Sequence, residues 1–262
     1  MTQRNLFLAI DVGNTTIECG IYRGEKLLTD WRLSSGSTHT PDERWQNLAF
    51  FSREADVDPT TIHRAAIASV APAHTYGFTE MIKSRLGCDP LLISAATCPF
   101  IEILYDNPDQ VGADRLCHAY AGFQLYGGPL IIVDFGTEIT FDVIDADGAY
   151  LGGVILPGPK TTADVLHRRT AQLPMVSFKF PDSVIGKSTD HAIQAGLSWG
   201  LVDMTDGMID RIRAELGANA RVVATGGFAK PYAARSRNFS ETRPDLVLEG
   251  IRRLFLRARA GA

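Results

Sequence analysis

Residues 6–15 read LFLAIDVGNT, an apolar run that ends in an Asp-x-Gly turn. Residues 130–137 repeat the pattern as LIIVDFGT. After each turn, apolar residues alternate with polar ones: Ile17, Cys19 and Ile21 in the first copy, and Ile139, Phe141 and Val143 in the second. An apolar run, a glycine turn and an alternating run are typical of a β-hairpin. The sequence therefore predicts two similar hairpins, one in each half of the chain.

Both turns have the composition of a phosphate-binding loop. A glycine at the tip lets backbone N–H groups approach an anion because no Cβ intervenes, and the side chains of Asn14, Thr15 and Thr137 add donors. The aspartates that end the two first strands, Asp11 and Asp134, can hold a cation beside the phosphates, directly or through water. One Asp-x-Gly is an ordinary turn signal. Two copies in matching contexts indicate a duplicated nucleotide-binding half, with ATP held in a cleft between related domains.

Two weaker motifs are open to a purely structural explanation. Residues 222–227, VVATGG, are an apolar strand that meets a glycine turn, which fits either a nucleotide contact or a strand-to-loop corner. Residues 186–189, GKST, imitate the end of a P-loop, but Pro181 stands where its first glycine belongs and no buried strand leads into it. Ser188 or Thr189 is equally suited to cap the helix that follows.

The composition bounds the class of protein. With 262 residues, 45% of them hydrophobic and 21% charged, the chain is long enough for two cores of similar size. A net charge of −4 without a Lys/Arg-rich run argues against nucleic acid and anionic membrane as partners. The apolar run 6–10 is too short for a signal peptide or a membrane span, which predicts a cytoplasmic protein. Four cysteines without Cys-x-x-Cys, and six histidines without His-x-x-x-His, argue against a zinc site.

Periodicity predicts two halves of alternating strands and helices. In the first half, after the meander that begins with the hairpin, we expect these elements: a helix from about 41 to 52, a strand at 65–70, a helix at 79–86 and a strand at 91–94. A helix over 114–126 joins the halves. In the second half we expect these: strands between 129 and 157, a helix at 163–169 and a long helix over 190–216. The apolar stripe of that last helix is suited to a core or to a subunit contact.

Read in order, the motifs resemble one family, the type III pantothenate kinases of the acetate and sugar kinase/Hsp70/actin superfamily. The matching blocks are these: DVGNT at 11–15, YDNP at 105–108, VGADR at 111–115, DFGT at 134–137, LGG at 151–153, TAQLP at 170–174, GKST at 186–189 and ATGG at 224–227. The resemblance implies an α/β fold of two duplicated ribonuclease H-like (actin-like ATPase) domains, which we place at 1–115 and 116–262. It also implies a homodimer.

The resemblance further implies a role for particular residues. The ATP-binding set would be Asp11, Val12, Gly13, Asn14, Thr15, Thr16, Ile17, Glu18 and Thr137. Asp114 would be the general base, and Asp134 would bind a monovalent cation, K⁺ or NH₄⁺. The pantothenate-binding set would be Tyr105, Gly112, Ala113, Asp114, Arg115 and Thr189. Mg²⁺ is expected as the counterion of ATP, held mainly by phosphate and water.

These roles agree with what phosphoryl transfer requires, which is neutralised phosphate charge and a positioned hydroxyl. Asp114 at a helix start would stay ionised and accept the hydroxyl proton, while Arg115 suits either substrate binding or a structural ion pair. Two departures from the family pattern stand out. Glu138 and Ile139 replace residues that are often small or hydroxyl-bearing in the family, and the charge of Glu138 follows a proposed phosphate contact. The turn at Thr15-Thr16 lacks the second asparagine that is common after the first loop.

The expected activity is ATP-dependent phosphorylation of pantothenate to 4′-phosphopantothenate, the first step of coenzyme A synthesis. Two alternatives remain at this stage. One is a catalytically weak relative that serves as a regulatory or accessory binding protein, which Glu138 favours. The other is an ATPase or polyphosphate phosphatase of the same fold, which leaves the Gly-Ala-Asp-Arg segment at 112–115 unexplained.

Overall fold

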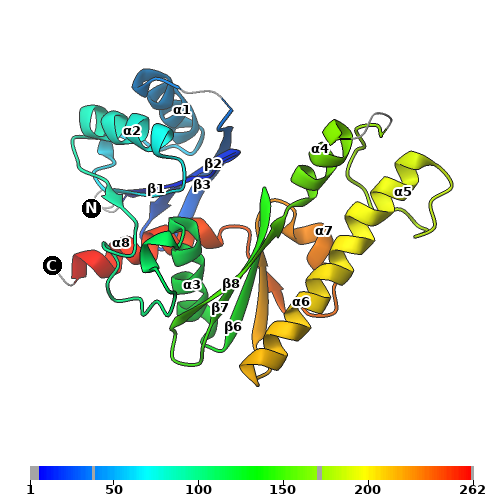
Figure 1. Cartoon of the computed structure of the whole chain (residues 1–262). Helices are drawn as coiled ribbons and strands as arrows, with labels where there is room; N and C mark the ends of the chain where they lie inside the picture. Colours follow the sequence, from blue (N-terminus) through cyan, green and yellow to red (C-terminus); the bar gives the residue numbers. More distant parts are fainter. Residues whose placement is uncertain (1–5, 37–38, 170–172, 261–262) are drawn as a thin grey trace. The chain divides into compact units, whose positions relative to one another are not determined.

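A computed structural model describes residues 6–36, 39–169 and 173–260 (Figure 1). Thr170, Ala171 and Gln172 of the predicted TAQLP block lie outside these residues. None of the described helices combines the length and the apolarity that a membrane crossing requires.

The chain divides into two compact units. Unit 1 comprises Met1–Ala121 and Leu246–Ala262, and unit 2 comprises Gly122–Asp245. These bounds differ from the predicted domains, 1–115 and 116–262, because the C-terminal helix packs with the first half of the chain.

Unit 1 is built on a five-stranded mixed sheet in the order β3-β2-β1-β4-β5. Its strands are β1 (Leu6–Val12), β2 (Thr16–Arg23), β3 (Lys26–Ser34), β4 (Ala65–Ser69) and β5 (Leu91–Leu92). The first three strands form the expected antiparallel meander, while β4 pairs parallel with β1 and β5 pairs parallel with β4. Six of the seven β1 side chains are buried, as a central strand covered on both faces requires.

Four α-helices belong wholly or mostly to unit 1. They are α1 (Pro41–Glu54), α2 (Pro72–Met81), α3 (Ala113–Tyr126) and α8 (Leu246–Ala260). α1 begins where the polar stretch predicted it, because Thr40 and Glu43 form a capping box and Pro41 occupies the first turn. α2 begins seven residues before the predicted Thr79 and runs into a π-helical turn at Ile82–Leu86.

The C-terminal helix α8 is the element that sequence reasoning missed. The ring of Phe255 in α8 packs against the ring of Phe7 in β1, with the two ring centroids 4.8 Å apart. At Gly250 the helix backbone comes so close to Cys117 of α3 that a Cβ would lie 2.6 Å from its carbonyl carbon. The apolar residues Leu246, Gly250 and Leu254 recur at helical spacing, which is the signal that predicts this helix.

Unit 2 repeats the topology of unit 1. Its strands are β6 (Leu130–Phe135), β7 (Glu138–Ile144), β8 (Tyr150–Pro157), β9 (Arg221–Thr225) and β10 (Glu241–Thr242). The order β10-β9-β6-β7-β8 is that of the first sheet, with an antiparallel meander followed by two parallel strands. Both predicted hairpins and the duplication are confirmed.

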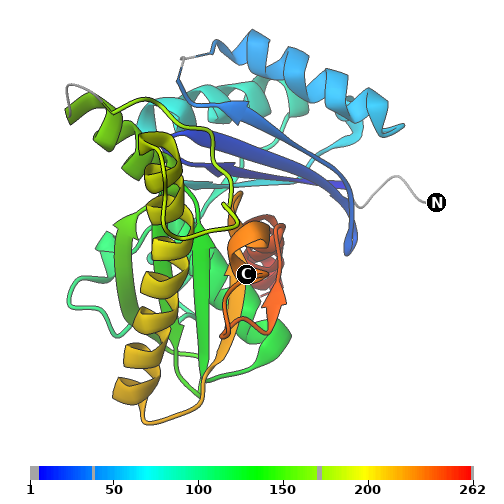
Figure 2. The same ribbon diagram turned by 90° about the vertical axis from the view of Figure 1, so that its right-hand side faces the viewer.

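The helices of unit 2 are α4 (Pro159–Arg169), α5 (Thr189–Ala195), α6 (Leu201–Leu216) and α7 (Ala229–Ala233). α5 and α6 are joined by a π-helical turn at Gly196–Gly200, so the predicted helix over 190–216 is present with one irregular turn. In Figure 2 this long rod lies along the second sheet. Its apolar stripe, including Met204 and Met208, packs on the core of the sheet, which assigns the stripe to the core.

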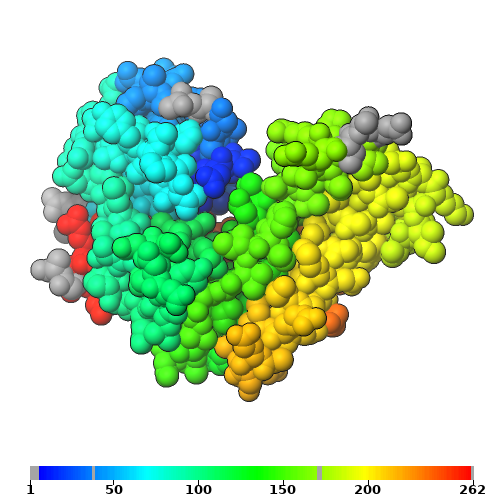
Figure 3. Space-filling model, viewed as in Figure 1, coloured from blue at the N-terminus to red at the C-terminus, as the bar shows by residue number. Residues whose placement is uncertain are grey.

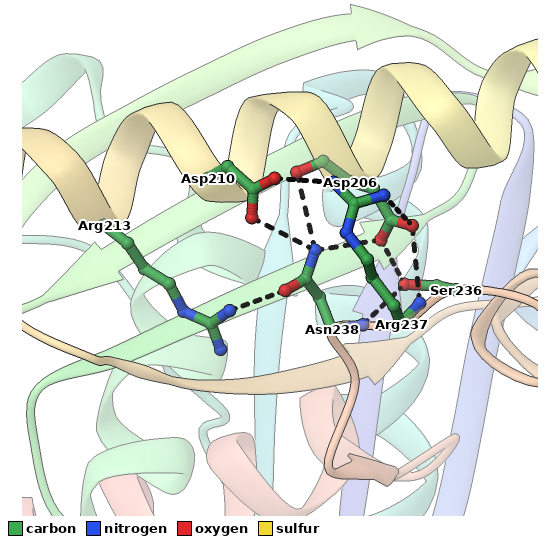
Figure 4. A network of polar contacts seen from close by, with 6 residues as sticks. All are labelled: Asp206, Asp210, Arg213, Ser236, Arg237 and Asn238. Carbon is green, nitrogen blue, oxygen red and sulfur yellow. Dashed lines mark hydrogen bonds and ion pairs between the residues drawn. The ribbon is translucent and has the colours of Figure 1, made fainter.

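A polar network fastens the loop after α7 to α6 (Figure 4). Asp206 is 3% exposed and accepts hydrogen bonds from Ser236 Oγ and Asn238 Nδ2 and from Arg237. Arg213 donates to Asn238 at 2.5 Å and to the carbonyl of Ala220. The loop therefore has a defined place beside β9, the strand that ends in the predicted ATGG motif.

Asp206→Ala should destabilise the protein by roughly 3 kcal/mol, because Ser236, Arg237 and Asn238 would all lose the buried carboxylate that accepts their hydrogen bonds. Asp210→Ala is the matched control on the next turn of the same helix. The Asp210 side chain is 49% exposed, and the pair that it forms with Arg237 should be worth less than about 1 kcal/mol. Urea unfolding of both variants compares them, and equal losses would contradict the assignment of stability to the buried carboxylate.

Candidate functional site

The first hairpin presents a short turn held by its own backbone. Gly13 donates its N–H to the carbonyl of Thr16 at 3.0 Å, and Ser35 Oγ donates to the carbonyl of Gly13 at 2.8 Å. Asn14 and Thr15 are exposed at the tip, and Thr16 is exposed beside them. These residues are therefore free of the core and accessible to an anion.

Three other members of the predicted ATP-binding set are not exposed at the tip of the hairpin. Val12 and Ile17 are buried in the core of unit 1, so only their backbone can face a ligand. Glu18 lies opposite Asp11 across the β1–β2 ladder. The two Glu18 carboxylate oxygens accept from Arg32 at 3.0 and 3.1 Å, and burial raises the Glu18 pKa against the lowering effect of this arginine. Its carboxylate is thus engaged with Arg32.

Asp114 lies in the first turn of α3 and is half-buried. Its Oδ1 accepts from the backbone N–H of Arg115 at 2.8 Å. A Cβ on Gly112 would collide with this same oxygen, so the glycine makes room for the aspartate. Ala113 and Arg115 are buried on either side, and Tyr105 is half-buried.

The structure brings Asp11 and Asp114 to the same buried thiol. Burial, followed by the charges of Asp11 and then Asp114, raises the pKa of Cys117 well above its usual range. Cys117 is therefore an inert thiol rather than a nucleophile. The charges of the aspartate of the first hairpin and of the aspartate of α3 thus both act on this thiol.

The second hairpin is braced by the segment after β8. The carbonyl of Thr137 accepts from Gly158 N at 2.9 Å and from Thr161 Oγ1 at 2.6 Å. Glu138 is exposed and accepts the N–H of Gly136 through its backbone carbonyl at 2.9 Å. Gly158 and Thr161 were not among the predicted site residues, because their part is to position the turn.

Asp134 lies beside the third glycine motif, VVATGG at 222–227, at the carboxyl-terminal ends of β6 and β9. β6 and β9 run parallel with Asp134 opposite Thr225. The following Gly226 has φ +91° and comes so close that a Cβ there would collide with Asp134 Oδ1. Asp134 is half-buried, as is Gly136 at the hairpin tip. The VVATGG segment is therefore part of the same constellation as the second Asp-x-Gly turn.

The surroundings of Asp134 fit a small cation with oxygen ligands. Thr140 lies directly opposite Asp134 on β7, and cross-strand partners project their side chains on the same face. Thr140 Oγ1 is buried with no hydrogen-bond partner. A carboxylate and an orphaned hydroxyl suit a hard cation. Among the described residues no three His, Cys, Asp or Glu side chains gather around one point.

Thr189 and the other residues of the GKST motif at 186–189 lie in unit 2. Ser188, rather than Thr189, caps α5, since its Oγ accepts from His191 N at 3.2 Å. Thr189 is exposed and lines an open, mainly apolar cavity of about 480 Å³ between α4 and the α5–α6 rod. The atoms of these helices lie side by side in Figure 3. Asp114 and Tyr105 lie in unit 1.

The comparisons with known proteins now name the family. A sequence model of type III pantothenate kinases matches residues 7–211. The chain belongs to the type III pantothenate kinase family. The type III pantothenate kinase of Moorella thermoacetica is 42% identical over 252 residues, which are 96% of this chain and 99% of that relative. A type III pantothenate kinase of Dehalococcoides mccartyi is 40% identical over 248 residues, 95% of this chain and 96% of the relative.

A distant solved structure agrees with the fold. Component A of the (R)-2-hydroxyglutaryl-CoA dehydratase of Acidaminococcus fermentans superposes with a TM-score of 0.54 at 13% identity, over 97% of this chain and 99% of that one. At this identity the likeness concerns the fold alone. The two units with matching sheets have the duplicated architecture of actin-like ATPases, as the resemblance implied.

Proposed function

We propose that this protein transfers the γ-phosphate of ATP to the 4′-hydroxyl of pantothenate. The observation that carries the proposal is the family match over almost the whole chain. The duplicated Asp-x-Gly hairpins support it, because each presents a glycine turn suited to phosphate. So does Asp114, because its charge and that of Asp11 both raise the pKa of the buried Cys117 thiol.

In the proposed reaction Asp114 accepts the proton of the pantothenate hydroxyl while that oxygen attacks the γ-phosphorus, and ADP leaves. The turn at Gly13–Thr15 and the turn at Gly136–Thr137 contribute backbone N–H groups and hydroxyls to the phosphates. Asp11 would face the Mg²⁺ that accompanies ATP, an ion that keeps most of its water and needs few protein ligands. Tyr105, the 112–115 segment and Thr189 would hold pantothenate.

ADP release tests the proposal when it is measured with and without pantothenate and with and without potassium. We expect ADP only when pantothenate is present, together with a product heavier by one phosphoryl group. ADP release that ignores pantothenate would point to an ATPase instead. No feature of the described residues favours a catalytically weak regulatory relative, since the charge of Glu138 is exposed to solvent.

Asp134→Ala should abolish activation by potassium and leave the magnesium requirement unchanged. The proposed ion is held by the Asp134 carboxylate and Thr140 Oγ1, and the carboxylate supplies the compensating charge. Glu138→Ala is the control, because this exposed carboxylate lies in the same hairpin and its loss should preserve the potassium effect. Rates in sodium and potassium buffers of equal ionic strength are compared. A wild-type protein that is equally fast in both would argue against the cation site.

Thr189→Val should raise the KM for pantothenate several-fold with an unchanged melting temperature, as expected for a lost substrate hydrogen bond. Ser188→Ala is the matched control from the neighbouring position. Because Ser188 caps α5, its loss should cost about 1 kcal/mol of stability and leave the KM unaltered. If Thr189→Val lowers the melting temperature without changing the KM, Thr189 is a structural residue.

The homodimer, the identity of the monovalent cation and the cytoplasmic location stay predictions. The dimer is supported by exposed apolar side chains in α4 and in the segment between α4 and α5. Those side chains are Val165, Met175, Val184 and Ile185.

A further inference from the structure

The phenol of Tyr232 in α7 is buried in the core that the second sheet shares with the α5–α6 rod. The residue is 1% exposed, and its hydroxyl donates to the backbone carbonyl of Leu197 at 2.6 Å. Burial raises the pKa of this phenol, so the hydroxyl keeps its proton and stays a donor. A side chain of α7 therefore holds the π-helical turn at Gly196–Gly200, which joins α5 to α6.

This π-helical turn changes the hydrogen bonding of the rod at Leu197. In a regular α-helix the Leu197 carbonyl would accept from the N–H of Leu201, four residues further on. In the structure that N–H donates to the carbonyl of Ser198 instead. The Tyr232 hydroxyl supplies a donor to the Leu197 carbonyl, and the loss of a donor is costly for a buried carbonyl. The hydroxyl therefore stabilises an irregular turn of a kind that is frequent at functional sites.

The same turn forms part of the wall of the cavity that contains Thr189. Gly196 and Leu197 of the turn, and Leu201 directly after it, line this cavity together with Thr189. Leu197 thus both accepts from Tyr232 and contributes to the wall. Because one residue has both contacts, a shift of its backbone would change the shape of the cavity.

The ring of Tyr232 contacts the second Asp-x-Gly turn. It stacks on the ring of Phe135, with the centroids 5.0 Å apart and the planes 2° apart. Phe135 is the middle residue of that turn, between Asp134 and Gly136. Its carbonyl also accepts from the N–H of Phe228 at 3.1 Å, at the start of α7. Tyr232 therefore touches the cavity wall through its hydroxyl and the glycine turn through its ring.

We propose that Tyr232 is a positioning residue for phosphoryl transfer, whose hydroxyl fixes the cavity wall at Leu197 and whose ring holds Phe135 in the second Asp-x-Gly turn. The inference rests on the proposed function, which places pantothenate beside Thr189 and phosphate at the turn. Two substitutions separate the two contacts. Tyr232→Phe removes the hydroxyl and keeps the ring, whereas Tyr232→Leu removes both.

Tyr232→Phe should raise the KM for pantothenate roughly three- to tenfold, because the cavity wall loses its hydrogen bond. The turnover number and the KM for ATP should stay near the wild-type values, since the ring still stacks on Phe135. An unchanged KM for pantothenate would overturn the proposal.

Tyr150→Phe is the matched control for this substitution. Tyr150 is also fully buried in unit 2, and its hydroxyl donates to Asp142 Oδ1 at 3.1 Å. Tyr150 is not among the residues that line the cavity. Its variant should therefore melt at a lower temperature than the wild type and keep the KM for pantothenate. An equal rise of this KM in both variants would contradict the proposal, because loss of stability alone would then explain the effect.

Tyr232→Leu tests the contact of the ring. The leucine variant should raise the KM for ATP as well as that for pantothenate, because Phe135 loses its stacking partner. A KM for ATP equal to that of Tyr232→Phe would remove the ring from the proposal.

Hydrogen exchange gives a readout that does not depend on the substrate. The amides of residues 196–202 should exchange faster in Tyr232→Phe than in the wild type, while those of residues 130–140 keep the wild-type rate. Wild-type exchange in both segments would overturn the proposed hold of the hydroxyl on the turn. Faster exchange at 196–202 in a protein that does not phosphorylate pantothenate would support this hold and refute the proposed function instead.

Discussion

Asp114→Asn should lower the turnover number by a factor on the order of 10² or more, the usual scale for the loss of a general base. The fold should persist, because the asparagine side-chain oxygen can still accept the Arg115 N–H that Asp114 Oδ1 accepts at 2.8 Å. Binding of ATP should persist as well, since the proposed phosphate contacts belong to the two hairpins. The predicted defect is thus confined to proton transfer from the acceptor hydroxyl.

Asp109→Asn is the matched control for this substitution. Asp109 lies five residues upstream in the short 3₁₀ turn at Pro108–Gln110, is exposed, and undergoes the same chemical change. Steady-state rates, calorimetric binding of ATP and melting temperatures are measured for both variants. An Asp114→Asn protein with near wild-type turnover would remove Asp114 from the role of base, whereas a loss of ATP binding would place it among the nucleotide contacts.

The elements that sequence predicted best are those that local periodicity specifies. Each hairpin combines a buried strand, a glycine turn and an alternating strand within about fifteen residues, and both form as expected. The cap of α1 is equally local, since Thr40 and Glu43 are three residues apart. The helix α8 carries its own periodic signal, but its place in unit 1 depends on contacts with Phe7 and Cys117, which are far away in sequence.

The site shows the same distinction. The motif at 11–18 was predicted as one block, yet the structure separates an exposed tip from the buried Val12 and Ile17 and from Glu18, which Arg32 engages. That pair arises from strand register, which pairs Glu18 with Arg32 across β2 and β3. Register between distant segments cannot be read from either segment alone.

Gly226 is the clearest case of a long-range constraint. Residues other than glycine are strained at φ +91°, and a Cβ at this position would collide with Asp134 Oδ1. Because β6 and β9 pair with Asp134 opposite Thr225, the aspartate cannot simply move away from the strand that carries Gly226. The substitution therefore acts on stability and on the proposed cation site together.

Gly226→Ala should destabilise the protein by roughly 2–3 kcal/mol and abolish potassium activation, because the displaced Asp134 carboxylate would no longer face Thr140. Gly227→Ala is the matched control, since a Cβ there meets no atom within 4 Å. Urea unfolding and rates in sodium and potassium buffers are compared for the two alanine variants. If Gly226→Ala is as stable and as responsive to potassium as Gly227→Ala, the close approach of Gly226 to Asp134 has no functional consequence. If Gly226→Ala alone loses both stability and potassium activation, the paired carboxyl-terminal ends of β6 and β9 support the cation site.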